Sequence, residues 1–240
     1  MASADLLLHN KVQVPREFNK IARRYDLATF LSQGYASDLK LSVQRMQLQG
    51  NEYIADLCCG TGKSTIACLE SVPEGKVLGI DFSEEMLNQA VMNVQPHYSD
   101  AQLQFRNMNV MELDYPDNSF DAIFMAYGIR NMPDYRTCLL NLHRMLRPGG
   151  VIAFHEYSLS ENVLARWYWR FMGYGLIIPL STLLTGSSRI FRYLIKSVLD
   201  FLSPDEFKTM LHDTGFKDVR SEPLPSWRRP VLRTFLARKA

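Results

Sequence analysis

The amino-acid sequence predicts an α/β fold, in which a largely parallel sheet is covered by helices on both faces. Between about Asn51 and Ser158, short apolar runs alternate with amphipathic segments, which is the pattern of repeated β-α units. A turn with two glycines, Gly60 and Gly62, follows the first apolar run and precedes a helical segment. Because α/β proteins bind ligands at the carboxyl ends of their strands, this turn also predicts where the functional site lies.

The composition is that of one folded domain with additions. The chain has 240 residues, 47% of them apolar, and a formal net charge of +2. Such a balance of charge is not typical of nucleic-acid-binding proteins, so no nucleic-acid partner is expected. The first residues lack the basic start of a signal peptide, and the spacing of the four cysteines is not that of a metal site. We therefore expect a cytoplasmic protein with reduced thiols and no metal.

Residues 1–50 are expected to form an N-terminal helical cap, and residues 51–240 the main domain. Pro15 suits the first turn of a helix. The residues that then share one helical face are Phe18, Ile21, Ala22 and Tyr25.

Seven segments of the main domain have the composition of strands. Ser83, followed by Glu84 and Glu85, is expected to cap the helix after the second strand. Pro148-Gly149-Gly150 is expected to end a helix and to turn the chain into the fifth strand. The predicted strands, in chain order, are Tyr53–Leu57, Val77–Asp81, Leu103–Arg106, Ala122–Ala126, Val151–Tyr157, Lys217–Glu222 and Val231–Ala237.

A helical insertion is expected before the last two strands, at about residues 160–202 and on the substrate side. Aromatic and apolar residues dominate it. After it, Ser203 and Glu206 form a capping box with Pro204 at the first helical position. Gly215 is expected to end that helix.

The loop that follows the first strand is expected to bind the cofactor, and its spacing separates three ligand classes. A phosphate-binding P-loop would need a glycine at Leu57, and a dinucleotide-binding loop would need one at Thr65. What remains is an acid, Asp56, at the end of a strand, followed by Gly60-Thr61-Gly62. This is the pattern of a loop that binds S-adenosylmethionine (SAM). Asp56 is expected to hold the loop or to meet the ammonium group of the ligand.

Two further strand ends support a SAM site. Asp81 ends the second strand, where a carboxylate can accept hydrogen bonds from both ribose hydroxyls, although NAD enzymes share this feature. Asn109 and the backbone of Val110 follow the third strand and are expected to meet the adenine. The strands are parallel, so all these residues should meet at one edge of the sheet.

By these marks the chain resembles the class I SAM-dependent methyltransferases. More narrowly, it resembles the UbiE/MenG-type C-methyltransferases of ubiquinone and menaquinone biosynthesis, from about Arg16 to the C-terminus. The most specific element is Gly128-Ile129-Arg130-Asn131. The other matching segments are Phe18 to Asp26, Asp56 to Gly62, Phe120 to Ile123, Leu146 to Gly150, and Phe191 to Leu194 through Gly215-Phe216.

This resemblance implies a Rossmann-like, seven-stranded sheet whose last strand is antiparallel. It also implies SAM contacts at Thr61, Asp81 and Asn109-Val110, and C-methylation of a prenylated quinol, either demethylmenaquinol or a ubiquinone precursor. The chain departs from many such enzymes at two positions. Cys58 stands where glycine or alanine is usual, and Ala126 stands where a serine is frequent, so one hydrogen bond to the cofactor is expected to be lost.

Methylation of a quinol carbon needs an electron-rich ring held in line with the methyl group in a dry site. Deprotonation of a neighbouring hydroxyl supplies the electron density, and a hydrogen-bond donor would stabilise the resulting phenolate. We predict that Arg130 and Asn131 act as this donor, directly or through a water molecule, and that Tyr25 is a further donor that closes the site. In the alternative, Arg130 only ties a loop to an acid such as Asp134. Tyr25 would then serve in packing.

The helical insertion suits an oily substrate. Its aromatic residues could line a prenyl tunnel or dip into a membrane interface, where flanking arginines would meet lipid headgroups. An ordinary buried helix pair would explain the same composition. The sequence therefore leaves a peripheral membrane contact and a homodimer open. The residues concerned include Trp167, Tyr168, Trp169, Phe171 and Tyr174, with Arg166, Arg170, Arg189 and Arg192 beside them.

Two other functions remain open at this point. A small-molecule methyltransferase for another aromatic or lipid acceptor, as in natural-product tailoring, would use the same cofactor loop. A SAM-binding protein without methyl transfer would also be compatible with Cys58 and Ala126. A nicotinamide oxidoreductase is disfavoured by Thr65, which stands where the third glycine of its loop would be.

Overall fold

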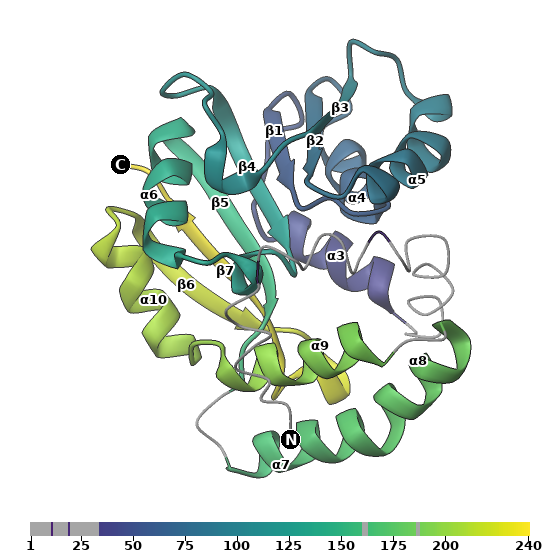
Figure 1. Ribbon diagram of the computed structural model, residues 1–240. Helices are drawn as coiled ribbons and strands as arrows, with labels where there is room; N and C mark the ends of the chain where they lie inside the picture. Colours follow the sequence, from purple (N-terminus) through teal and green to yellow (C-terminus); the bar gives the residue numbers. More distant parts are fainter. Residues whose placement is uncertain (1–10, 12–18, 20–33, 160–162, 186–187) are drawn as a thin grey trace.

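The computed structural model describes residues 11, 19, 34–159, 163–185 and 188–240. They form a twisted sheet with helices on both faces, which confirms the predicted fold class (Figure 1). The strands are β1 (Tyr53–Leu57), β2 (Lys76–Asp81), β3 (Leu103–Asn107), β4 (Phe120–Ala126), β5 (Leu146–Tyr157), β6 (Lys217–Pro223) and β7 (Leu232–Arg238).

The seven strands follow the order β3-β2-β1-β4-β5-β7-β6. Strands β1 to β5 are parallel to one another, whereas β7 runs antiparallel to both β5 and β6. The chain begins the sheet at β1, builds outward to β3, and then crosses back to β4 on the other side of β1. This crossover leaves a crevice at the carboxyl ends of β1 and β4, where open α/β sheets bind ligands.

Two hydrophobic clusters, one on each face, hold the helices to the sheet. One cluster includes Leu39 and Val43. The other cluster, on the opposite face of the sheet, includes Leu139 and Leu211. The first face carries α3 (Tyr35–Gln44), α4 (Lys63–Ser71) and α5 (Glu84–Val94), and the second carries α6 (Tyr135–Met145) and α10 (Pro204–Asp213). Short helical turns connect some of these elements, namely η2 (Gln95–His97), η3 (Val110–Glu112), η4 (Ile129–Asn131) and η6 (Ser226–Arg228).

The predicted starts of two helices are confirmed, and in both a serine side chain accepts a hydrogen bond from a backbone N–H of the first turn. The Ser83 hydroxyl accepts from Met86 N at 3.2 Å at the start of α5. Ser203 and Glu206 form the reciprocal capping box of α10. That helix ends where Gly215, at φ 97°, donates to His212 O at 3.0 Å, as the sequence predicts.

The start of β5 differs from the prediction. Helix α6 ends at Met145 and β5 begins at once, so Pro148-Gly149-Gly150 lie within the strand and do not end the helix. Leu146 pairs with Phe120, whereas Val151 pairs with Ala122. The Pro-Gly-Gly residues therefore form a bulge-like irregularity, in which β5 has more residues than the paired part of β4. The sequence pattern does not distinguish such a bulge from a turn.

The insertion between β5 and β6 consists of α7 (Val163–Met172), η5 (Gly173–Ile177), α8 (Ile178–Thr185) and α9 (Arg189–Asp200). The chain stays helical through Gly173 and Gly175 as a π-helical turn, η5, just before Pro179. Proline lacks the N–H that an α-helix needs, and a π turn is one way to accommodate that loss. Over the part of the chain that is described, no helix is long and apolar enough to cross a membrane.

Candidate active site

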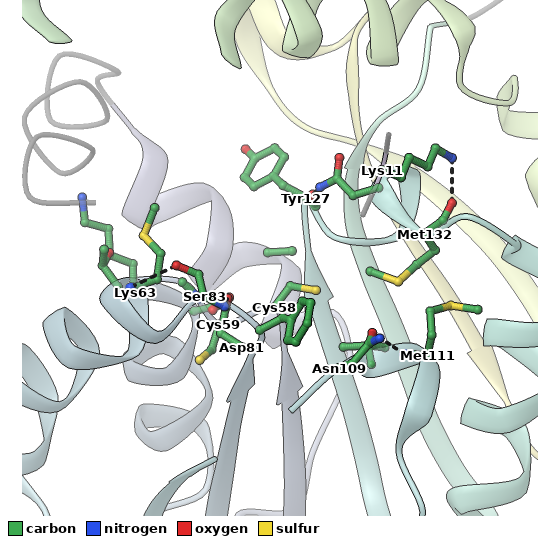
Figure 2. A pocket seen from close by; sticks show the side chains of 18 of the residues that line it. Lys11, Cys58, Cys59, Lys63, Asp81, Ser83, Asn109, Met111, Tyr127 and Met132 are labelled. Carbon is green, nitrogen blue, oxygen red and sulfur yellow. Dashed lines mark hydrogen bonds between the residues drawn. The ribbon is translucent and has the colours of Figure 1, made fainter. Parts of the chain in front are cut away.

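A cavity of about 440 Å³ opens at the carboxyl ends of the central strands (Figure 2). Its size lies in the range of small-molecule sites. Of the predicted cofactor residues, those that line it are Gly60, Thr61, Asp81, Asn109 and Val110. Asp56 and Gly62 are not among the described lining residues.

The loop between β1 and α4 is shaped by its two glycines. Gly60 has φ 56°, and a Cβ built on it would meet no atom within 4 Å, so the backbone borders open space there. Gly62 has φ 90°, and a Cβ there would come within 2.6 Å of Val94 Cγ2 in α5. Gly60 thus allows a ligand to approach, whereas Gly62 allows α4 to pack against α5.

Asp56 of β1 holds the loop through hydrogen bonds from the first turn of α4. Its Oδ2 accepts from Ser64 Oγ at 2.8 Å and from Thr65 Oγ1 at 2.7 Å, and the side chain is fully buried. Oδ1 has no hydrogen-bond partner among the described residues. Burial raises the pKa of Asp56 to about 7, although its two hydroxyl partners oppose the shift. Of the two roles considered for Asp56, the contacts correspond to holding the loop.

Asp81 joins the loop to the next helix. Its Oδ2 accepts from Gly60 N and its Oδ1 accepts from Ser83 N, both at 2.8 Å. Burial raises the pKa of Asp81, and the backbone donors oppose that rise. Among the described residues each carboxylate oxygen accepts one hydrogen bond, and an ionised oxygen has about two acceptor positions. A ligand in the cavity can therefore donate to both oxygens.

Asn109 uses its side chain to shape the turn after β3. Its Oδ1 accepts from Met111 N at 3.0 Å, and its Nδ2 donates to Glu112 Oε1 at 2.9 Å. The amide thus caps η3 and faces the cavity with one N–H of Nδ2 engaged. Its second N–H, together with the neighbouring backbone, can meet a base.

Arg130 is buried in η4, and its guanidinium points toward β5 and α9. It forms an ion pair with Glu156 of β5, and its Nε donates to Ser197 Oγ of α9 at 3.1 Å. Both charged side chains are buried, at 4% and 0% exposure. Arg130 is absent from the described lining of the cavity. The acid it ties is Glu156, whereas Asp134 caps α6 by accepting from Thr137 N.

Asn131, the next residue, does line the cavity. Its Nδ2 donates to Tyr127 O at 3.0 Å, and its Oδ1 accepts from Tyr193 OH of α9 at 2.9 Å. An amide nitrogen carries two N–H donors, so the second can be offered to a ligand. Tyr25, the third predicted catalytic residue, lies outside the described residues.

A buried polar chain supports the wall near Asn131. The Tyr127 hydroxyl lies 2.9 Å from His155 Nε2, and His155 Nδ1 lies 2.7 Å from Ser42 Oγ. Burial lowers the pKa of His155 to about 3, helped by the positive charges of Arg45 and Arg228. A neutral imidazole with so low a pKa is a poor base at neutral pH. His155 instead holds the ring of Tyr127 in place. The backbone of Tyr127 has φ 55°.

Several lining residues were not predicted from the sequence. Lys63 follows Gly62 directly, and Tyr127 directly precedes the Gly-Ile-Arg-Asn segment, so proximity in sequence could have indicated both. Tyr35, Met111 and Met132 come from other elements and carry no signal of their own. Figure 2 shows how Lys63, Asp81, Asn109 and Met132, from separate parts of the chain, lie around one space.

Comparison with known proteins gives a consistent result. Residues 7–226 match the ubiE/COQ5 methyltransferase family. A demethylmenaquinone methyltransferase of Geobacillus stearothermophilus is 36% identical over 220 residues, which cover 88% of this chain and 91% of the relative. One from Staphylococcus aureus (strain JH9) is 33% identical over 221 residues, which cover 88% of each chain.

Solved structures of low sequence identity share the fold. The cyclase SpnF has a TM-score of 0.72 at 16% identity, with 95% of each chain covered. A SAM-dependent methyltransferase from Thermotoga maritima has a TM-score of 0.68 at 16% identity, with 95% of this chain and 100% of that chain covered. Such likeness identifies the architecture alone, because one fold can support several chemistries.

Proposed function

Because the chain belongs to the ubiE/COQ5 methyltransferase family, we propose that it transfers the methyl group of SAM to a ring carbon of a prenylated quinol of the demethylmenaquinol type. The names of the similar proteins favour this ring over a ubiquinone precursor. The observation that carries the proposal is that one cavity is lined both by the Gly60 loop with Asp81 and by Asn131.

The residues present fit SAM. Asp81 has acceptor positions left for two ribose hydroxyls, and Gly60 leaves open space for a ligand beside the backbone. The turn at Asn109 and Val110 would border the adenine. SAM supplies an electrophilic methyl group, and the protein has to orient the acceptor and exclude water around it.

Asn131 is proposed as the residue that contacts the quinol oxygen. Its second amide N–H would donate to this oxygen and stabilise negative charge as the neighbouring carbon becomes nucleophilic. Tyr127 O and Tyr193 OH hold the amide in place. Arg130 would act through its neighbour, since its pair with Glu156 anchors η4 to β5. The role of Tyr25 as a further hydrogen-bond donor to the substrate remains a prediction.

Transfer of labelled methyl from SAM tests the proposed function. The protein should label reduced demethylmenaquinone in preference to a demethylated benzoquinol tested alongside it. Labelling of the benzoquinol alone would assign the ring to the ubiquinone type. If SAM binds but neither quinol is labelled, the quinol proposal is wrong, and other acceptors or a protein without methyl transfer would take its place.

Replacing Asp81 with alanine should weaken SAM binding by about a hundredfold, because two hydrogen bonds to a charged acceptor are lost. Calorimetric titration with SAM measures the change. Asp121→Ala is a matched control, because Asp121 also accepts a backbone N–H, from Tyr53 at 2.9 Å, but at the opposite end of the strands. Equal affinities for the Asp81→Ala variant and the control would contradict this role.

Replacing Asn131 with alanine should lower kcat by about 100- to 1000-fold, which is the usual effect of removing one donor to a developing negative charge. The affinity for SAM should change little. Tyr193→Phe is the companion variant, since it removes the bond to Asn131 Oδ1 but keeps the ring. It should lower kcat less than Asn131→Ala. An Asn131→Ala enzyme with normal kcat would exclude the proposed contact.

A further inference from the structure

The outer face of the helical insertion exposes an unusual number of large apolar side chains. Nine of the fourteen that are exposed in the described chain belong to α7, η5 and α8. In Figure 1 these elements run in succession along the rim of the molecule, with α9 on their inner side. We call this surface the rim face. It consists of Val163, Leu164, Trp167, Tyr168, Phe171, Tyr174, Leu176, Leu180 and Leu183.

The same helices are also apolar on their inner face. Trp169 is buried, and its indole N–H donates to Ile195 O of α9 at 3.2 Å. A Cβ at Gly173 would come within 2.6 Å of Ile195, so the two helical segments pack closely. The core is therefore complete without the rim face. A helix with apolar residues all round needs cover on both sides, and exposed patches of this kind mark interaction sites.

The charge of the insertion identifies what could cover it. From Val163 to the end of α9 the insertion contains one acid, Asp200, which pairs with Lys196 at 2.8 Å, and its other charged residues are all basic. Trp167 and Tyr174 have the amphipathic rings that suit the boundary between headgroups and acyl chains. Arg170 is exposed on the same helix as Trp167 and Phe171. The basic residues are Arg166, Arg170, Arg189, Arg192 and Lys196.

We propose that the rim face docks on the surface of a lipid bilayer that contains anionic headgroups. Apolar and aromatic side chains would enter the interface while the arginines meet the headgroups. A second copy of the chain is a poorer occupant. A twofold interface would bring the basic segments of two copies together, and the one acid of each segment, Asp200, is already paired with Lys196.

The rim face is linked to the active site through α9. Tyr193 of this helix donates to Asn131 Oδ1 at 2.9 Å, and Ile195 of the same helix contacts Trp169 of α7. This inference rests on the proposed function in one respect. If the acceptor is a prenylated quinol, docking would place the cavity one helix away from the bilayer in which such a substrate dissolves.

Vesicle flotation tests the docking surface. We expect the protein to float with vesicles of equal parts phosphatidylcholine and phosphatidylglycerol, and less with phosphatidylcholine alone. A variant with both Phe171→Ser and Leu183→Ser should bind roughly a hundredfold less, since each buried large side chain contributes about tenfold. The matched control carries Met92→Ser and Leu140→Ser, at exposed positions of α5 and α6. It should bind as the unmodified protein does.

Tryptophan fluorescence adds a local measurement. Trp167 is 63% exposed and Trp169 is 3% exposed. Lipids with brominated acyl chains should quench the protein's fluorescence, and Trp167→Phe should remove most of the quenching but preserve binding. Arg170→Gln should reduce the preference for anionic vesicles.

Three results would overturn the proposal. These are no flotation of the unmodified protein, equal flotation of the double variant and its control, or a dimer in lipid-free solution that the double variant dissociates. Methylation of a short-chain quinol that dissolves without vesicles separates this proposal from the proposed function. The double variant should keep that activity, whereas a failure of the function itself would abolish labelling in every variant.

Discussion

Replacing Arg130 with alanine should lower the free energy of unfolding by about 3–5 kcal/mol, which is the usual cost of removing one partner of a buried ion pair. Glu156, at 0% exposure, would keep its carboxylate in the core without a counter-charge. Burial already raises the pKa of Glu156, and Arg130 opposes that rise. Without Arg130 the carboxyl group should bind a proton more readily. The loss of stability should therefore be larger at about pH 8 than at about pH 5.

Urea unfolding of the variants measures this effect. Arg130→Ala combined with Glu156→Gln should recover much of the loss, because no uncompensated charge remains. Asp134→Ala is the control, since Asp134 caps α6 at the surface and forms no pair with Arg130. If Arg130→Ala unfolds at the same urea concentration as the unmodified protein but has lost turnover, Arg130 acts on the substrate, as the sequence analysis predicts.

The strands and the cofactor loop could be predicted because local signals determine them. The segment Tyr53–Leu57 is uniformly apolar apart from Asp56, and it forms a buried central strand with the predicted bounds. Gly60 and Gly62 occupy conformations with positive φ, which few other residues adopt. Parallel strands bring successive strand ends to one edge, so Asp81 and Asn109 follow into the site.

The direction of long side chains could not be predicted in the same way. Arg130 and Asn131 are adjacent in sequence, yet one pairs with Glu156 in the core and the other lines the cavity. The difference depends on β5 and α9, which contribute Glu156 and Ser197 from distant positions. No local pattern reports such contacts. The exposed rim face was equally ambiguous, because a buried helix pair has the same composition.

Replacing Asp56 with asparagine should remove a pH dependence of stability. The pKa of Asp56 is raised from 3.8 to about 7, so the folded state binds this proton more tightly than the unfolded chain. The free energy of unfolding should then fall as pH rises between about 4 and 7, by up to about 4 kcal/mol, and should not fall further above that range. Asparagine keeps an acceptor oxygen for Ser64 and Thr65 but carries no charge.

The measurement is the difference between Asp56→Asn and the unmodified protein, because other groups titrate as well. The pKa of His155 is lowered to about 3, so its contribution rises with pH up to about 6.5 and opposes that of Asp56. The contribution of His155 is the same in both proteins, so it cancels in the difference.

Asp134→Asn is the control, since hydrogen bonds from Thr137 lower the pKa of Asp134 and confine its effect to acid conditions. An Asp56→Asn variant whose stability runs parallel to that of the unmodified protein from about pH 5 to 8 would mean that Asp56 is ionised in the folded core throughout. The loop would then be held by an ionised Asp56 carboxylate rather than by a neutral carboxyl group.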